Sequence, residues 1–293
     1  MASALGSVHH LESGGTSGMT GQNTIVITGA SSGIGLAAAE QLAARDDQVV
    51  LVGRDERRLA AAVDRVRTAG RGIEPGHFQA DFERLADVRA LADHLLSTYP
   101  QIDVLANNAG MVAMSHRTTV DGHEATIQVN HLAPFLLSNL LRERLRGGRI
   151  VNTSVRPGPG VRLDPDDLND EGQRYKGVAA YQNSKAANVL FAMEAARRWP
   201  DILSLSLHPG LVRTDIGRDT ALRYVFRYAP LLISPERSAR RLVRLATASA
   251  AELTNGALYG SGKPIAPNPR LFNPVNAARL WTTSEEAVTD PAT

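Results

Sequence analysis

A glycine-rich turn near the start of the chain constrains its fold more than any other feature. A β-branched run at 24–28 predicts a strand, and an alanine-rich stretch at 34–45 predicts a helix. The turn between them contains Gly29, Gly33 and Gly35. Glycines at these positions allow a tight turn and let backbone N–H groups approach an anion at the positive end of the helix. The pattern predicts an α/β fold that binds a nucleotide; its alternative is an ordinary turn rich in glycine.

The same turn supplies the first candidate cofactor contacts. Ser31 and Ser32 add hydroxyl donors to the backbone N–H groups. The glycine spacing is G-x-x-x-G-x-G rather than the G-x-G-x-x-G of the commonest dinucleotide-binding fold. The candidate cofactor-binding residues of the turn are Gly29, Ser31, Ser32, Gly33, Ile34 and Gly35.

The rest of the chain alternates between short β-branched runs and longer helical stretches, which is typical of a parallel sheet covered on both faces. Further strands or strand ends are expected at 48–53, 73–80, 102–110, 149–154, 202–210 and 257–260, and helices at 55–69, 84–99, 180–199 and 236–248. The sequence therefore predicts one doubly wound, Rossmann-type α/β domain over 24–293, with a parallel sheet of about seven strands flanked by helices. Residues 1–23 are expected to form a flexible extension, and no apolar run is long enough for a membrane span.

Composition narrows the functional classes. The 293 residues include no cysteine, which excludes a disulfide, a thiolate metal site and a cysteine nucleophile and favours a cytoplasmic location. The formal net charge is only +2 and no basic stripe is concentrated in one place, so nucleic-acid binding is disfavoured. Nearly all cations are arginine, because lysine occurs only as Lys176, Lys185 and Lys263. A lysine within a motif is therefore informative.

Tyr181 and Lys185 are the candidate catalytic pair. Four residues apart on a predicted helix, they lie on one face about one turn from each other. A nearby ammonium is expected to lower the pKa of the phenol toward the working pH. Tyr181 would then donate a proton to a carbonyl oxygen, or remove one in the reverse reaction. Read alone, this spacing is common and structural; the scarcity of lysine and the accompanying motifs favour catalysis.

Three motifs together resemble the short-chain dehydrogenase/reductase family. They are the glycine-rich turn, the segment Asn107-Asn108-Ala109-Gly110 after a predicted strand, and the Tyr181/Lys185 pair. The resemblance covers residues 24 to about 260. The segments 129–137, 180–191 and 208–215 are especially similar to the retinol dehydrogenase-like branch. The resemblance implies a nicotinamide-dependent oxidoreductase that forms homodimers or homotetramers.

The resemblance also implies roles for individual residues. Asp81 would meet the adenine edge, and Thr214 would contact the nicotinamide amide; the alternatives are a helix cap and a turn residue. Asn130 would support a water in a proton relay, and as a buried amide it would also bond the backbone. Lys185 would hold the nicotinamide ribose. The remaining candidate cofactor contacts are Asn107, Ala109, Gly110, Tyr181, Pro209 and Gly210.

Arg54 indicates which cofactor is preferred. An acidic residue at the end of the second strand would bond the ribose 2′-hydroxyl, whereas an arginine there would attract a 2′-phosphate. The strand ends in Gly53-Arg54-Asp55, and Ser31 could also reach the phosphate. NADP(H) is therefore predicted in preference to NAD(H). The alternative is that Arg54 is solvated at the helix start and paired with Asp55.

Val155 departs from the family pattern. Relatives carry two serines after this strand, and the second bonds the substrate oxygen; the aligned residues here are Ser154 and Val155. Valine donates no hydrogen bond to a developing oxyanion, and loss of one such donor typically costs about 10²-fold or more in rate. One interpretation turns the hydroxyl of Ser154 or Thr153 into the pocket. The other leaves the site without this donor, which suits slow reduction, a self-polarising substrate or a non-redox dehydratase or cyclase.

The leading hypothesis is an NADP(H)-dependent oxidoreductase that interconverts a ketone or aldehyde and an alcohol on a lipophilic or polycyclic small molecule. The apolar stretch 215–233 would form a lid over such a substrate, or else a surface helix packed on the core or a second subunit. The insertion 156–178 would form the opposite wall, and its acids lack the spacing of a metal site. A non-redox enzyme and a nucleotide-sensing protein are the rival hypotheses.

Overall fold

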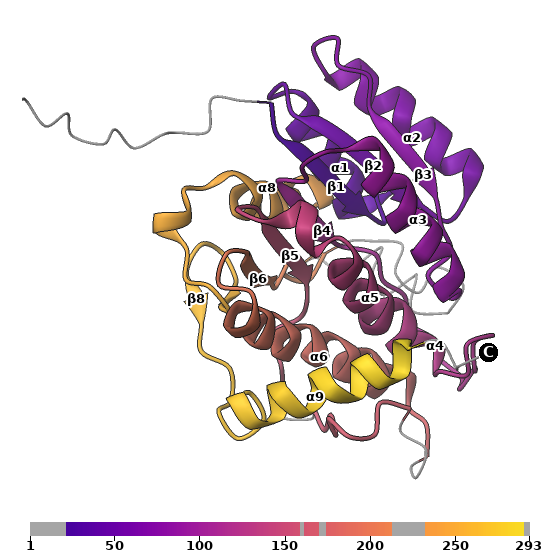
Figure 1. Cartoon of the computed structure of the whole chain (residues 1–293), viewed down its shortest axis with the longest axis vertical. Coiled ribbons are helices and arrows are strands. Elements are labelled where there is room, and N and C mark those ends of the chain that lie inside the picture. The colour runs from indigo at the N-terminus through magenta and orange to yellow at the C-terminus, as the bar shows by residue number, and fades with distance from the viewer. Residues whose placement is uncertain (1–21, 159–160, 170–173, 213–231, 290–293) are drawn as a thin grey trace, which may run out of the picture.

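The computed structural model describes residues 22–158, 161–169, 174–212 and 232–289. A twisted sheet lies between two layers of helices (Figure 1). In the described residues the sheet has eight strands in the order β3-β2-β1-β4-β5-β6-β7-β8. All neighbouring pairs are parallel except β7 and β8, which pair antiparallel. The strand bounds are β1 Thr24–Thr28, β2 Gln48–Gly53, β3 Gly76–Gln79, β4 Val104–Asn107, β5 Arg149–Thr153, β6 Leu203–Leu207, β7 Leu258–Tyr259 and β8 Pro264–Ile265.

The strand order reverses between β1 and β4. A parallel sheet of this kind binds its ligand in the crevice outside the carboxyl ends of the strands at such a reversal. The glycine-rich turn follows β1, and the Asn-Asn-Ala-Gly segment begins at the end of β4. The topology therefore brings two motifs that are far apart in the sequence to one edge of the sheet.

Apolar side chains bury both faces of the sheet. On one face, α1 (Gly33–Ala43), α2 (Glu56–Ala69) and α8 (Pro235–Thr247) pack on a core that includes Ile25, Ile27 and Leu205. On the other face lie α3 (Leu85–Thr98), α5 (Ala133–Leu140) and α6 (Gly177–Arg198), and α9 (Pro274–Val288) runs along the outside of α6 (Figure 1). Short elements complete the fold: α4 Ala125–Ile127, the π-helical turn η1 Gln128–Leu132, and the 3₁₀ turns η2 Arg142–Leu145 and η3 Ala250–Glu252.

The predicted doubly wound α/β fold is confirmed, with three elements that the sequence pattern did not indicate. β8 has two residues, one of them proline, so no apolar run marks it. The α4-η1-α5 segment is buried from Ala125 to Ser138, so it has no exposed polar face that would mark it as a surface helix. α9 is capped by Asn273, whose side chain accepts from the backbone N–H of Asn276. Ser234 is the N-cap of α8, and its Oγ accepts from the backbone N–H of Arg237.

No helix in the described part of the chain is both long and apolar enough to cross a membrane. The predicted extension at residues 1–23 lies almost wholly outside the described residues, which begin at 22.

Candidate active site

The glycine-rich turn forms a close-packed cradle at the N-terminus of α1. Gly29 and Gly33 have φ of +65° and +57°, a conformation that favours glycine. A Cβ on Gly29 would lie 2.8 Å from Ala109 Cα, and one on Gly35 would lie 2.7 Å from Asn108 Nδ2 and overlap the carbonyl oxygen of Gly29. Ser32 is the N-cap of α1, but its side chain does not cap the helix. The first N–H groups of α1 therefore point out of the turn, which is the arrangement that binds a phosphate.

Asn108 and Thr28 join this turn to the end of β4. Asn108 Nδ2 donates to the carbonyl oxygens of Thr28 (3.1 Å) and Gly29 (3.4 Å). Thr28 Oγ1 in turn accepts from the backbone N–H groups of Asn108 and Ala109, each at 3.0 Å. The sequence did not single out either residue as a site residue, although Asn108 lies within the Asn107-Asn108-Ala109-Gly110 motif. The pairing of β1 with β4 is what makes them neighbours.

The structure corrects the placement of Asn107. Its side chain does not line a cofactor trough: it is 1% exposed and donates to Ser138 Oγ (3.1 Å) and Asn152 Oδ1 (2.9 Å) between the sheet and α5. Side chains alternate along a strand, so Asn107 points inward where Asn108 points toward the turn. Asn107 Oδ1 has no hydrogen-bond partner among the described residues.

Ile34 and Asp81 are also placed in structural roles. The side chain of Ile34 is 7% exposed within the core, so only its backbone N–H faces the turn. One carboxylate oxygen of Asp81 accepts from the backbone N–H of Glu83 (3.1 Å), which is a cap of the turn that leads into α3. Asp81 therefore stabilises the turn before α3, whose N-cap is Arg84, so it is not the helix cap itself; its contact with adenine stays a prediction.

Arg54 lies at the exposed end of β2 and is paired with Glu83 rather than with Asp55. Arg54 Nη1 is 3.2 Å from Glu83 Oε1, and Arg117 makes a second, closer ion pair with the same carboxylate. The hydrogen bond from Arg117 is the largest cause that lowers the pKa of Glu83. Asp55 instead caps α2 by accepting from the backbone N–H of Arg58 (3.0 Å). Two guanidinium groups thus gather beside the predicted 2′-phosphate position.

Ser31 lies directly over the end of the same strand. A Cβ on Gly53 would come within 3.3 Å of Ser31 Oγ. Because Gly53 has no side chain, the Ser31 side chain can pack directly on the end of the strand. The fold therefore brings the hydroxyl of Ser31 next to the residue that precedes Arg54.

Tyr181 and Lys185 both lie on α6, as predicted, and Lys185 Nζ is 5.9 Å from the centre of the Tyr181 ring. Burial raises the pKa of Tyr181 to about 12, and burial lowers the pKa of Lys185 to about 8. The pKa of the phenol therefore shifts opposite to the expected direction, because burial disfavours the charged tyrosinate. Tyr181 is a protonated phenol throughout the neutral range.

Ser154 and Thr153 do not present their hydroxyl groups to Tyr181. Ser154 is 1% exposed, and its Oγ donates to the backbone carbonyl of Lys185 at 2.5 Å. Thr153 Oγ1 donates to Asn108 Oδ1 at 3.3 Å. The structure thus contradicts the interpretation in which a local shift turns either hydroxyl into the pocket. The hydroxyl of Ser154 instead links the end of β5 to α6. The half-buried Val155 is the next residue along the chain.

Asn130 lies in the π-helical turn η1 and is fully buried. Its side chain accepts from the backbone N–H of Met111 (2.8 Å) and donates to the carbonyl oxygen of Met111 and to Ser184 Oγ, both at 2.9 Å. This is the buried-amide role. Gly110 lies beside it, where a Cβ would be 3.0 Å from Lys185 Nζ. The two residues bring the loop after β4 against the ammonium.

Pro209 and Gly210 follow β6, and side chains of α8 bond to the backbone of Pro209. The carbonyl oxygen of Pro209 accepts from Ser238 Oγ and Arg241 Nη1, both at 3.0 Å, and Gly210 has a φ of +93°. Thr214 and nearly all of the predicted lid at 215–233 lie outside the described residues.

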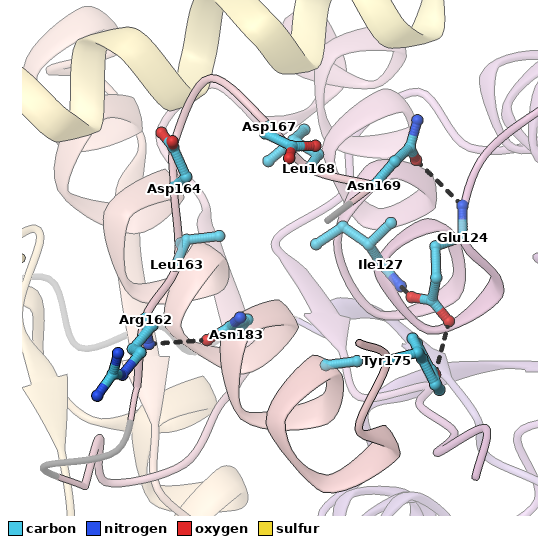
Figure 2. Close-up of a pocket in the computed structure, with 11 residues that line it drawn as sticks. Glu124, Ile127, Arg162, Leu163, Asp164, Asp167, Leu168, Asn169, Tyr175 and Asn183 are labelled. Atoms are coloured by element: carbon cyan, nitrogen blue, oxygen red, sulfur yellow. Dashed lines mark hydrogen bonds between the residues drawn. The ribbon is translucent and has the colours of Figure 1, made fainter. Parts of the chain in front are cut away.

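A separate cavity of about 20 Å³ is lined by residues of the 162–169 segment, by Tyr175 and by the start of α4 (Figure 2). Tyr175 Oη donates to Glu124 Oε1 (2.9 Å), and Glu124 also accepts from the backbone N–H groups at the start of α4. This volume holds about one water molecule. Neither Tyr181 nor Lys185 lines the cavity, so it belongs to the joint between the insertion and α4 rather than to the active site.

Comparisons with known proteins agree with this geometry. A family model described as short chain dehydrogenase matches residues 23–164. A Streptomyces (strain C5) protein named "Putative daunorubicin C-13 ketoreductase DnrU" is 50% identical over 278 residues, which cover 92% of this chain and 93% of that protein. Retinol dehydrogenase 13 of Homo sapiens is 35% identical over 280 residues, covering 90% and 84%.

The chain belongs to the short-chain dehydrogenase/reductase family. Within it, the chain is retinol dehydrogenase-like, as the sequence motifs indicated. A solved short-chain dehydrogenase from Sphingobium yanoikuyae in complex with NADPH has 28% sequence identity and a TM-score of 0.62, and the match covers 76% of this chain and 84% of that one.

Short-chain dehydrogenases use a nicotinamide dinucleotide, and the residues present here fit that group. The uncapped N-terminus of α1 and the side-chain-free surface of Gly29 and Gly35 suit a pyrophosphate. Lys185 Nζ lies near Gly110 and near the Tyr181 ring, so these two side chains are the ones that would hold the nicotinamide ribose.

Proposed function

We propose that this short-chain dehydrogenase/reductase is an NADP(H)-dependent enzyme that interconverts a ketone or aldehyde and an alcohol on a lipophilic or polycyclic small molecule. The observation that carries the proposal is the Tyr181/Lys185 pair on α6, with Lys185 buried and Tyr181 half-buried, beside the end of the glycine cradle. A catalytic acid needs its proton at the working pH, and burial keeps the Tyr181 phenol protonated. The pair therefore suits carbonyl reduction.

The positions of the side chains suggest a separate role for each residue in the reaction. The nicotinamide supplies or accepts a hydride when bound. Tyr181 donates the proton to the carbonyl oxygen, and no hydrogen bond from the described residues contributes to its shifted pKa. Lys185 holds the ribose and supplies positive charge beside the phenol. Val155 contributes no donor and the Ser154 hydroxyl is bonded to the Lys185 carbonyl, so Tyr181 is the proposed donor to the substrate oxygen.

The preference for NADP(H) is proposed from the charges beside β2. Arg54 and Arg117 share the carboxylate of Glu83, and Arg54 directly follows Gly53, over which the hydroxyl of Ser31 lies. An exposed guanidinium binds a phosphate in a bidentate way. The Sphingobium yanoikuyae structure, solved with NADPH, is consistent with this preference.

The lipophilic substrate class is supported by apolar side chains at the start of α6. Gly177 packs closely against Ala113 and Met114, so the loop after β4 meets the helix one turn before Tyr181. Met114 is 46% exposed and Val178 is 50% exposed at this junction. The names of the Streptomyces and human relatives refer to a ketone and to an alcohol, the two sides of one redox reaction.

Loss of NADPH absorbance with a panel of carbonyls tests the proposal. The panel should contain daunorubicin, retinal and small hydrophilic ketones, and Tyr181→Phe serves as the inactive control. We expect turnover with the apolar members and a drop of about 10²-fold or more in the variant. Tight NADPH binding without oxidation by any carbonyl, in the wild type and in Val155→Ser alike, would favour the dehydratase, cyclase or sensor alternatives. The cytoplasmic location, the homo-oligomeric state and the domain limits stay predictions.

A further inference from the structure

A buried network of hydrogen-bonded polar groups extends from α9 to Lys185. It joins Ser284 on α9, His131 in η1, Asn188 on α6 and the carbonyl oxygen of Thr153 at the end of β5. Each of the three polar side chains is 1% exposed or less. The mechanism proposed above uses none of them, and a fully buried polar network is costly unless every member is satisfied.

The amide of Asn188 has one allowed orientation. Its Nδ2 lies 2.8 Å from the carbonyl oxygen of Asn130 and 3.4 Å from that of Thr153. Carbonyl oxygens only accept, so the nitrogen must face them and Oδ1 must face the other way. The residue four positions after Asn130 is Pro134, which has no backbone N–H to bond the carbonyl of Asn130 within the helix.

His131 secures that orientation from the opposite side. Its Nδ1 is 3.2 Å from Asn188 Oδ1, and its Nε2 is 2.8 Å from Ser284 Oγ. Because Oδ1 can only accept, we assign the proton to Nδ1. Nε2 then accepts the single proton of the Ser284 hydroxyl, for which the carbonyl oxygen of Leu280, 2.7 Å from Oγ, is the competing acceptor. Burial lowers the pKa of His131 to about 4, so this neutral tautomer persists at neutral pH.

At the other end of this hydrogen-bonded network, the Thr153 carbonyl fixes the position of the Lys185 ammonium. Lys185 Nζ donates to the carbonyl oxygen of Thr153 at 3.2 Å, the same atom that Asn188 Nδ2 approaches. The titratable group that faces Lys185 is Tyr181 on its own helix; the loop after β4 presents Gly110, and β5 presents the Thr153 carbonyl. The ammonium thus has a single protein hydrogen-bond acceptor among the described residues, and Asn188 shares it.

We propose that His131, acting through Asn188, is a positioning residue for Lys185. It holds the Asn188 amide so that nitrogen, and not oxygen, faces the Thr153 carbonyl. Without the Nδ1 donor, Oδ1 is buried with no partner, and a turned amide regains one by placing Oδ1 beside the ammonium as a competing acceptor, at the expense of the bonds to the carbonyl oxygens of Asn130 and Thr153. Lys185 would then move away from its place next to Tyr181, and the added acceptor would favour its charged form. The proposal rests on the proposed function only for the role of Lys185.

Lysine scarcity makes a direct test possible. Protein labelled with ¹³C at lysine Cε gives signals from Lys176, Lys185 and Lys263 alone, so the titration of Lys185 can be followed by NMR without substrate or cofactor. We compare wild type with His131→Leu, which removes the donor, and with His131→Asn, whose amide nitrogen can take the place of Nδ1. Phe135→Leu is the control for packing, because its ring lies against His131 but makes no bond to Asn188.

We expect His131→Leu to raise the Lys185 midpoint, to shift the pH profile of kcat/KM in the same direction and to lower kcat about tenfold, since an ångström of misplacement can cost about 10²-fold. His131→Asn should restore all three. A Lys185 midpoint that is unchanged or lowered in His131→Leu would overturn the proposal, as would loss of thermal stability alone to the extent seen in Phe135→Leu. Because the NMR titration needs no turnover, its failure is distinguishable from failure of the proposed reaction.

Discussion

At the scale of single residues, Val155 and Arg54 lead to specific predictions about the catalytic rate and the cofactor preference. Val155 follows β5 where a hydroxyl donor would meet the substrate oxygen, and the hydroxyls of Thr153 and Ser154 are committed to Asn108 Oδ1 and to the Lys185 carbonyl. The sequence motif predicted the missing donor. It did not predict that both neighbouring hydroxyls are occupied, because their partners lie on β4 and α6.

We predict that Val155→Ser raises NADPH-dependent turnover of a ketone by about 10-fold to 10²-fold, since it adds a second donor to the developing oxyanion. Steady-state kinetics with one substrate at fixed pH measure the effect. Val155→Ala controls for the change in size and should give no gain. Equal rates for the serine and alanine variants would mean that no donor is lacking.

We predict that Arg54→Asp raises the KM for NADPH at least about tenfold while changing the KM for NADH little, because a charge-assisted bond to the 2′-phosphate is replaced by repulsion. Glu83 would then face one arginine fewer, which leaves its pair with Arg117 in place. Arg57→Asp, an exposed charge change on the first turn of α2, is the matched control. A similar rise in both KM values would contradict the assigned cofactor preference.

At the scale of elements, the turn between β1 and α1 depends on contact with β4. A Cβ on Gly35 would collide with the carbonyl oxygen of Gly29 and with Asn108 Nδ2. The first atom is backbone and cannot rotate away, so α1 must shift if Gly35 is replaced.

We predict that Gly35→Ala lowers the free energy of unfolding by about 1–3 kcal/mol and weakens NADPH binding, because it moves the N–H groups at the start of α1. Urea unfolding and a fluorescence titration with NADPH measure the two effects. Gly158→Ala is the control, since nothing lies within 4 Å of the added Cβ. Wild-type stability and affinity in Gly35→Ala would show that the turn is looser than its contacts indicate.

At the scale of the whole molecule, α9 closes the fold over α5 and α6. Trp281 packs edge-on against Phe135 and Trp199, with ring centres 5.0 Å apart in each pair. Ser284, one turn later, meets the buried His131. The C-terminal helix therefore bonds to the layer that carries Asn130 and Lys185.

Acid should destabilise this arrangement through His131. Its folded pKa of about 4 lies below the ordinary value of 6.5, so the unfolded chain binds the proton more readily. This contribution is complete above pH 6.5 and is lost as the pH falls toward 4, at a total cost of about 3 kcal/mol. Urea unfolding between pH 7 and pH 4.5 should show a smaller decline in His131→Asn than in wild type, whereas the exposed control His116→Asn should follow wild type. Parallel declines in all three proteins would refute the assignment.

The sequence by itself determined the fold class, the glycine turn and the Tyr181/Lys185 pair, because each depends on residues within one turn or one period of an element. Tertiary structure decided what lies between distant segments: Asn108 on the glycine turn, Glu83 between Arg54 and Arg117, and Ser154 on the Lys185 carbonyl. It also decided the pKa of Tyr181, which burial raises although a lysine is near. Spacing in the sequence reports which groups share a helix face, whereas hydration and hydrogen-bond partners are set by the elements that pack around that face.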